Sequence, residues 1–266
     1  MEAASDTLPS RDRLRPLRYL WRVPLLLLHI VFGILICALI LSWAGGVMRN
    51  GREPFAHRTI RFWSTGLLRV FGFRSRRYGT SLSDPVLFVA NHTSWLDIEL
   101  MHTQRAACFV AKAEIANWPL VGWMAARGGT IFHRRGNNHS LTSVMSVMVE
   151  RLRAGRSVAV FPEGGTGHNG VLRVFHARIF QAALDAEVPV QPVALRFARD
   201  GHRLIDIGFR EGESFLANII RLLGEAPLDA EVHFLEPVPA SPDARRRMAE
   251  SSRERIAAAL GSDTSA

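Results

Sequence analysis

The chain has 266 residues, of which 48% are hydrophobic and 21% are charged, and its formal net charge is +9. This length accommodates one α/β domain with an appendage, and the composition excludes a disordered chain or a long coiled coil. Two distant cysteines, Cys37 and Cys108, exclude a disulfide framework and a zinc site, while the basic balance favours anionic partners: nucleic acid, a membrane surface or phosphorylated substrates.

A membrane helix is predicted near the N-terminus. Residues 24–44 carry no formal charge, and at about 1.5 Å per residue they match a hydrocarbon core of about 30 Å. A cleavable signal peptide is one alternative, although signal cores are shorter, about 7 to 15 residues. A buried core helix is the other, although few soluble helices are apolar on every face. Five arginines precede the apolar run: Arg11, Arg13, Arg15, Arg18 and Arg22.

The following segment, residues 55–77, mixes large apolar side chains with arginines. Phe62, Trp63 and Leu67 occur beside Arg58, Arg61 and Arg69. This pattern predicts an amphipathic helix at the lipid headgroups, with rings among the acyl chains and arginines against phosphates. Because arginines flank the apolar run on both sides, the positive-inside rule leaves open whether the first helix spans or re-enters.

From Gly79 onward, short apolar runs alternate with helical periodicity, which predicts an α/β fold with a mixed, largely parallel sheet flanked by helices. The clearest helix is 140–154, before Gly155. The predicted strands are 86–90, 108–111, 130–133, 157–161, 190–197, 204–209 and 231–235. We expect an N-terminal membrane-associated region at 1–77, a main domain at 78–240, and a surface helix with a disordered tail at 241–266.

A histidine and an aspartate follow the first predicted strand of the main domain. His92 lies at the carboxyl end of that strand, where open α/β sheets form their ligand sites, and Asp97 falls in the first turn of the next helix. A carboxylate that fixes one imidazole nitrogen as a donor leaves the other to accept a proton from a substrate hydroxyl. In the alternative interpretation, Ser94 to Asp97 is only a capping box.

Two further strand ends bring charged residues to the same type of edge. One predicted strand ends at Arg134 and Arg135, and another delivers Glu163 with a glycine-rich loop. Guanidinium groups pair two phosphate oxygens at once, so the arginines suit a phosphate. A carboxylate beside them can hold them in place or bind a polyol hydroxyl.

Four ordered motifs between about Leu82 and Phe197 carry a family resemblance. They are the H-x4-D block NHTSWLD, then GTIFHRR, FPEGGT and VPVQPV. Together they resemble the lysophosphatidate (1-acyl-glycerol-3-phosphate) acyltransferase family of membrane-bound glycerolipid acyltransferases. The resemblance implies that His92 is the general base and Asp97 its partner. It further implies an acceptor site formed by Arg134, Arg135, Glu163, Gly164 and Thr166.

The third motif departs from the family pattern E-G-T-R. Gly165, Thr166, Gly167 and His168 follow Glu163, so one expected arginine is missing. The form FPEGGTGHNGVLRVF is similar to a subgroup that includes lyso-ornithine lipid acyltransferases. The sequence favours 1-acyl-glycerol-3-phosphate as the acceptor, giving phosphatidic acid, and lyso-ornithine lipid is the alternative.

The resemblance also implies the remaining components of the reaction. The acyl donor is an acyl thioester, either acyl-CoA or acyl-carrier protein, with no cofactor and no metal. Because these donors are cytoplasmic, the catalytic domain is expected to face the cytoplasm on a bacterial-type inner membrane and to contact anionic lipids, and no nucleic-acid partner is expected. This favours a monotopic or re-entrant N-terminal segment over a simple span.

Individual sequence patterns also match other classes of function. Gly165-x-Gly167-x-x-Gly170 fits a dinucleotide fingerprint, and the basic charge allows a nucleic-acid-binding protein. A hydrolase would need a nucleophile elbow G-x-S-x-G, which the sequence lacks. A metal site would use His92, Asp97, Glu99 and His102, but residues two apart on a helix point to different faces.

Overall fold

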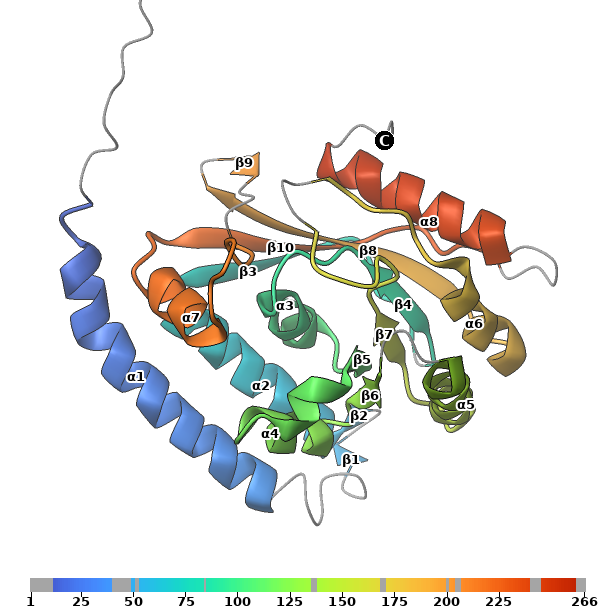
Figure 1. The fold of residues 1–266 in the computed structure, drawn as a ribbon, viewed down its shortest axis with the longest axis horizontal. Coiled ribbons are helices and arrows are strands. Elements are labelled where there is room, and N and C mark those ends of the chain that lie inside the picture. Colours follow the sequence, from blue (N-terminus) through green and yellow to red (C-terminus); the bar gives the residue numbers. More distant parts are fainter. Residues whose placement is uncertain are drawn as a thin grey trace, which may run out of the picture.

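The computed structural model describes residues 12–39, 49–50, 53–83, 85–134, 138–167, 171–199, 201–203, 207–239 and 245–261. Its centre is an eight-stranded sheet with the order β3-β10-β8-β4-β7-β5-β6, and β9 pairs with β8 beside this path (Figure 1). The strands are β3 (Phe73–Tyr78), β4 (Leu87–Ala90), β5 (Cys108–Lys112), β6 (Ile131–His133), β7 (Val158–Val160), β8 (Val190–Arg199), β9 (His202–Arg203) and β10 (Leu228–Phe234).

The sheet is mixed and largely parallel, as the sequence predicts. The run β8-β4-β7-β5-β6 is parallel throughout, and β3 is parallel to β10. Strand β10 is antiparallel to β8, so the two parallel groups run in opposite directions. A separate two-stranded ribbon consists of β1 (Arg49–Asn50) and β2 (Glu53–Pro54).

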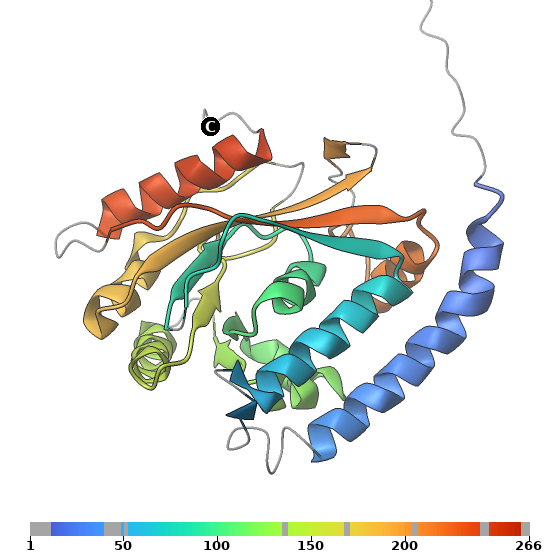
Figure 2. The ribbon, with the colours of Figure 1, turned by 180° about the vertical axis from the view of Figure 1, so that it is seen from behind.

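Helices cover both faces of the sheet (Figures 1 and 2). One face carries α2 (Phe55–Val70), α3 (Leu96–Gln104) and α7 (Phe215–Leu223), with α1 (Arg15–Ile36) outside them, and the other carries α5, α6 and α8. The remaining bounds are η2 (Ala113–Asn117), α4 (Val121–Arg127), α5 (Asn138–Arg153), η3 (Ala177–Phe180), α6 (Gln181–Ala186) and α8 (Arg245–Leu260).

Strand β4 shows why the fold has two cores. Side chains alternate across a strand, so Phe88 and Ala90 enter the cluster on the α2 and α3 face. Leu87 and Val89 enter the cluster on the α5 and α8 face. All four are buried, which explains a continuous apolar run in place of alternation. This central strand is therefore rigidly held where it delivers the residues that follow it.

Helix α1 begins at Arg15 and includes Pro24, and it covers residues 24–36 of the predicted apolar run 24–44, of which 40–44 lie outside the described residues. Among the described residues, it is the one helix long and apolar enough to cross a membrane. Most of its large apolar side chains are exposed, which contradicts a buried core helix. Arg22 is buried against the C-terminus of α7, and Arg15 and Arg18 are half-buried beside it, so these three arginines contact the domain.

The amphipathic helix expected over 55–77 differs in length and in partner. It ends at Val70, because Gly72 adopts a left-handed conformation (φ +82°) and Phe73 starts β3. Its residues Leu67 and Leu68 pack into the protein core, whereas Phe62 stays exposed. The expectation that this whole segment lies at lipid headgroups is therefore wrong for its apolar face.

Strand predictions held in the buried centre and failed at the periphery. Within the predicted strand 204–209, residues 204–206 lie outside the described residues, and Ile207–Phe209 are not in a strand. The C-terminal helix α8 is more than a surface helix, because Met248, Ile256 and Leu260 are buried against the sheet. Residues 262–266, expected to be disordered, lie outside the described residues.

Candidate functional site

The carboxyl ends of the parallel strands β4, β7 and β6 lie at one edge of the sheet. Strand β4 leads to His92, β7 leads to Phe161 and Glu163, and β6 leads to Arg134. Neighbouring strands lie about 4.8 Å apart, so residues after β4 and β7 are adjacent. Arg134, three strands from β4, starts about 14 Å away along the edge. The sequence thus predicted the common edge correctly.

His92 and Asp97 are in direct contact. Nδ1 of His92 lies 2.9 Å from Oδ2 of Asp97, and the aspartate side chain is fully buried while the imidazole is 14% exposed. Asp97 belongs to the first turn of α3, and the three loop residues 93–95 place it back at the strand end. A carboxylate on Nδ1 holds the Nδ1–H tautomer, which leaves Nε2 as the acceptor.

Asp97 also organises the loop between them. Its Oδ2 accepts hydrogen bonds from the main-chain N–H groups of Thr93 (2.6 Å) and Ser94 (2.8 Å). The capping interpretation and the catalytic interpretation are therefore compatible, because the same carboxylate binds both the main chain of Ser94 and the imidazole of His92. Because three donors converge on it, the side chain has a fixed orientation toward the imidazole.

The imidazole of His92 stacks on an aromatic side chain that was not predicted from the sequence. The Phe161 ring stacks on His92 with centroids 3.9 Å apart and planes 9° apart. Phe109 continues the stack behind Phe161, and His102 meets Phe109 edge to face. Burial lowers the pKa of His102 to about 4, so this second histidine stays neutral. The signal for Phe161 was present in the F-P-E-G motif, as the residue directly after β7 and two before Glu163.

Glu163 is buried, with 2% of its surface exposed. Its Oε1 accepts the main-chain N–H of His92 (2.8 Å), and its Oε2 accepts that of Arg173 (3.0 Å). Burial raises the pKa of Glu163, and these two amides oppose the rise. The carboxylate therefore links the loop after β4 to the loop after β7. This structural role differs from the substrate contact expected for Glu163 from the sequence.

The glycine-rich loop closes over the strand end. Gly167 donates its N–H to the carbonyl of His92 (2.7 Å), and Gly164 donates to Phe161 (3.1 Å). Gly164 has φ +71° and is exposed, and Thr166 is half-buried between these two positions. Within the described part of the loop, the amides of Gly165 and Thr166 have no protein acceptor.

The basic residues of the site are placed unevenly. Arg134 is exposed, and Arg135 lies outside the described residues. Arg203 on β9 is a basic side chain that the sequence did not single out. Burial and the neighbouring Arg196 lower its pKa, while the negative charges of Glu163 and Asp97 act in the opposite direction. Arg203 is thus within electrostatic range of the site, although its strand is remote in sequence.

Helix α7 contacts the H-x4-D loop through a buried polar network. Trp95 donates from Nε1 to Oδ1 of Asn218 (2.9 Å), and Asn218 is fully buried. Asn218 donates in turn to the carbonyl of Gly208 (3.1 Å) and to Glu213 (2.9 Å). A hydrogen bond from Arg221 lowers the pKa of Glu213 well below its ordinary range. This support lies outside the four motifs, so motif spacing could not reveal it.

Two rival sites lack the required geometry. A dinucleotide fingerprint opens a helix, but residues 171–176, after the glycine-rich loop, are not helical. Among the residues that the structure describes, no group of three His, Cys, Asp or Glu side chains could hold a metal. Glu99 instead accepts a hydrogen bond from Ser64 of α2 (2.7 Å).

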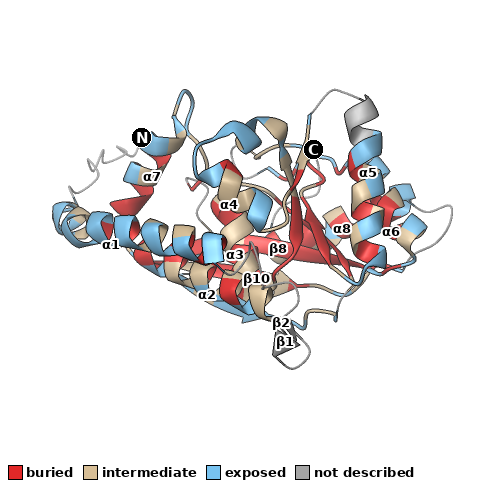
Figure 3. Cartoon of the chain, turned by 90° about the horizontal axis from the view of Figure 1, so that it is seen from below, coloured by how far each residue is buried: buried red, intermediate tan, exposed pale blue. Residues whose placement is uncertain are grey.

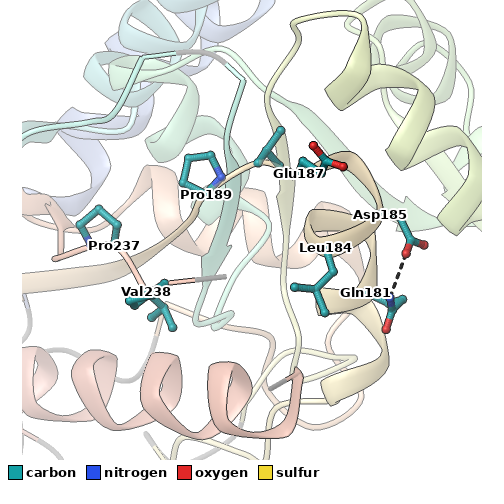
Figure 4. A pocket seen from close by; sticks show the side chains of 9 residues that line it. Gln181, Leu184, Asp185, Glu187, Pro189, Pro237 and Val238 are labelled. Carbon is teal, nitrogen blue, oxygen red and sulfur yellow. Dashed lines mark hydrogen bonds between the residues drawn. The ribbon is translucent and has the colours of Figure 1, made fainter. Parts of the chain in front are cut away.

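An open hollow of about 740 Å³ lies elsewhere (Figure 4). Its lining includes Pro189, Leu184 and Val238. Pro189 directly precedes β8, whereas His92 follows β4, and these two strands are parallel. The hollow is therefore at the amino edge of the sheet, opposite the His92 site. Val188 and Pro189 of the VPVQPV motif line it, but none of the candidate catalytic or acceptor-binding residues does.

Sequence comparisons place this geometry among known proteins. A family model described as Acyltransferase matches residues 73–196. The chain is 36% identical over 207 residues to a lyso-ornithine lipid O-acyltransferase from Pseudomonas aeruginosa, covering 78% of this chain and 80% of the relative. It is 31% identical over 230 residues to another from Brucella abortus, covering 81% and 85%.

Two further relatives bear on acceptor and fold. A 1-acyl-sn-glycerol-3-phosphate acyltransferase from Neisseria gonorrhoeae is 40% identical over 112 residues, which cover 42% of this chain and 44% of the relative. The crystal structure of the 1-acyl-sn-glycerophosphate acyltransferase PlsC from Thermotoga maritima aligns with a TM-score of 0.57 and 19% identity. It covers 90% of this chain and 97% of that one, so the two share a fold.

Proposed function

Because the chain belongs to the acyltransferase family of lysophosphatidate and lyso-ornithine lipid acyltransferases, we propose that it transfers a fatty acyl group from a thioester to the free hydroxyl of a lyso-ornithine lipid at a membrane. The single observation that carries the reaction is the His92–Asp97 contact of 2.9 Å beside a stacked Phe161. Acyltransferase activity follows from the family, and the acceptor, the residue roles and the membrane attachment are the proposal.

The proposed chemistry uses Nε2 of His92 as the general base. It takes the proton of the acceptor hydroxyl while that oxygen attacks the thioester carbonyl. The new C–O bond forms, the tetrahedral intermediate collapses with loss of the C–S bond, and the imidazolium returns the proton to the departing thiolate. Asp97 stabilises the imidazolium and fixes the ring, in the way that the aspartate of a catalytic triad does.

The oxyanion of that intermediate needs donors aimed at it. We assign the main-chain amides of Gly165 and Thr166, because those of Gly164 and Gly167 already donate within the protein. Glu163 would then act by positioning: its carboxylate holds the main chain of His92 and the loop after β7 in register. Such an assignment departs from the acceptor contact that the family motif implies.

The acceptor follows from the relatives and from the missing arginine. Two lyso-ornithine lipid acyltransferases align over more than three quarters of this chain. After Glu163 and Gly164 the chain has Gly165 and Thr166, where the E-G-T-R pattern has threonine and arginine. An ornithine headgroup carries one carboxylate and one ammonium, so it needs fewer cations than a phosphate monoester. Arg203, Arg134 and Arg135 are the proposed partners of that carboxylate.

Lysophosphatidate remains a second candidate acceptor. The specific observation in its favour is the 40% identity to the Neisseria gonorrhoeae 1-acyl-sn-glycerol-3-phosphate acyltransferase over 112 residues. The consecutive arginines Arg134 and Arg135 would suit its phosphate. The proposed donor for either acceptor is acyl-CoA or acyl-carrier protein, and the reaction then needs no further cofactor.

Membrane attachment through α1 is part of the proposal. The most apolar 18 residues of the helix have a mean hydropathy of 2.3, and only 28% of that stretch is buried in the protein. It is docked along the domain, since Arg22 binds α7 and Gly33 packs on Trp63 of α2. Because the helix contacts the domain along its length, this arrangement favours attachment to one leaflet. A helix that crossed the bilayer would have to separate from the domain. Because both donors are cytoplasmic, the domain would face the cytoplasm of a bacterial inner membrane.

The test is an acylation assay in which lyso-ornithine lipid and lysophosphatidate are offered separately with each donor. We expect at least tenfold higher kcat/KM for lyso-ornithine lipid. A tenfold preference for lysophosphatidate would overturn the acceptor while leaving the mechanism. For the mechanism, His92→Ala should lower kcat by about 10²- to 10⁴-fold without loss of fold. A rate within about tenfold of wild type would refute the general base.

A further inference from the structure

A second apolar surface lies beside α1. On α7, Leu216 is 64% exposed and Ile220 is 49% exposed, and they are four residues apart on one helix face. The turn between η2 and α4 adds Leu120 at 49% exposed, flanked by Trp118 and Val121. We call these five residues, Trp118, Leu120, Val121, Leu216 and Ile220, the α4–α7 surface.

This surface is continuous with α1. Arg22 of α1 donates to the carbonyl of Leu223 (2.9 Å), which holds the C-terminus of α7 against α1. At the other end, Met124 of α4 reaches within 2.9 Å of the position that a Cβ on Gly33 would occupy. The gap between them is bridged by Trp118, whose ring lies 5.0 Å from that of Phe215 on α7. Figure 3 shows exposed residues along α1 and on the neighbouring α7 and α4.

Leu120 has a strained backbone conformation. Its φ of 61° and ψ of −55° lie outside the regions favoured for a residue with a Cβ. Non-glycine residues keep such conformations where the surrounding structure imposes them, and they gather at functional positions. Here the strain holds a large apolar side chain in solvent, where folding gains nothing from it.

Charge and residue type suit a bilayer. No acidic residue occurs in α1, in α7 or in residues 118–127, and the chain as a whole has a net charge of +9. Trp21 on α1 is 50% exposed and Trp118 is 37% exposed. Tryptophan is enriched where protein meets the membrane–water interface. A protein partner would gain no ion pair from an acid on these elements, whereas anionic lipid attracts the arginines that precede the apolar run of α1.

We propose that the α4–α7 surface enters the same leaflet as α1 and forms a second lipid contact around the active site. The inference rests on the proposed attachment of α1 but not on the identity of the acceptor. On the opposite face of α7, Asn218 accepts a hydrogen bond from Trp95. Trp95 lies between His92 and Asp97 in the chain. Lipid contact by α7 therefore sets the depth at which a membrane-borne acceptor meets the base.

The first test reads the surface directly and needs no turnover. Leu216→Cys and Leu120→Cys are labelled in the full chain with an environment-sensitive fluorophore, because the native Cys37 and Cys108 are buried. Ala258→Cys, exposed on α8 on the far side of the sheet, is the matched control. Vesicles of phosphatidylethanolamine and phosphatidylglycerol should shift the emission to the blue at 216 and 120 but not at 258.

Two outcomes overturn the proposal. Emission that is unchanged at 216 and 120, while the protein sediments with the vesicles, would mean that α1 alone holds the lipid. A blue shift that grows with protein concentration in the absence of vesicles would mean that a second copy of the chain covers the surface. Failure of the protein to sediment with vesicles at all would instead overturn the proposed attachment, so the two failures are distinguishable.

The second test measures the consequence for turnover. Leu216→Glu combined with Ile220→Glu should lower the ratio of kcat/KM on vesicle-borne acceptor to that on micelle-borne acceptor by about tenfold, since each large apolar side chain loses its burial in lipid. Ala258→Glu should leave the ratio unchanged. Because the ratio is taken within one variant, a partial loss of folded enzyme cancels. An unchanged ratio in the double variant overturns the proposal.

Discussion

Oε1 of Glu163 accepts the main-chain N–H of His92 at 2.8 Å. The residue that the family motif assigns to the acceptor is thus bound to the backbone of the proposed base. Its second oxygen accepts the N–H of Arg173, and only 2% of the residue is exposed. The F-P-E-G motif and the H-x4-D motif are therefore joined through one buried carboxylate before any substrate is present.

Replacement of Glu163 separates positioning from acceptor binding. Glu163→Gln keeps the shape but turns one acceptor oxygen into an N–H donor that faces another donor. An unsatisfied buried group costs about 1 to 3 kcal/mol, so we expect a lower Tm and a kcat reduced by at least tenfold, with the acceptor KM within about threefold. Glu211→Gln, at an exposed glutamate, is the control. A raised KM with unchanged kcat would restore the acceptor contact.

Glu99 makes stability depend on pH. Burial raises its pKa from 4.5 to about 7, and the hydrogen bond from Ser64 only partly opposes this. Because the folded state holds the proton more tightly than the unfolded chain, this contribution to stability is complete below about pH 4.5 and is lost as pH rises to about 7. Glu99→Gln removes the titration.

The measurement is Tm against pH for both proteins. Wild type should lose Tm relative to Glu99→Gln between about pH 5 and pH 7, with no further divergence above that range. Parallel curves across this window would show that Glu99 ionises in the folded protein as it does in solvent. Because Glu99 faces α2 and not the His92 site, the pH profile of kcat should be unaffected.

Arg22 is expected to hold α7 in place. Its Nη1 donates to the carbonyls of Leu223 and Glu225 at the C-terminus of that helix, where a cation also suits the helix dipole. Arg22→Met keeps the length and removes both donors. Hydrogen bonds to charged groups contribute about 1.5 to 3 kcal/mol, so Tm should fall and amide exchange in α7 should accelerate. Arg13→Met, at an exposed arginine, should change neither.

Gly208 leaves room for the loop that carries the base. A Cβ at this position would lie 2.6 Å from the carbonyl oxygen of Thr93, the residue after His92. Gly208→Ala must displace that loop, and we expect a loss of at least tenfold in kcat. Gly212→Ala is the matched control, because it has open space but φ +70°. That change should lower stability by about 1 to 2 kcal/mol and leave kcat intact.

The centre of the fold and the order of its motifs could be predicted from sequence, because a strand buried on both faces is a continuous apolar run. Strand β4 and the residues His92 and Asp97 after it are the clearest case. Strand β3, with the sequence FRSRRY, could not be recognised. After Phe73 it has only polar residues and a tyrosine, as is common in a strand at the edge of a sheet. Asn218 and Arg203 were missed because tertiary packing, not spacing, brings them to the site.

The position of β10 has a consequence for biosynthesis. This strand, near the C-terminus, lies between β3 and β8 and pairs with both. The nascent chain releases α1 first and β10 almost last, so α1 can reach the lipid while β3 still lacks its neighbour in the sheet. Under the proposed attachment of α1, completion of the sheet would take place on a chain already held at the bilayer, and a ribosome that stops before Leu228 would leave an anchored but unfinished sheet.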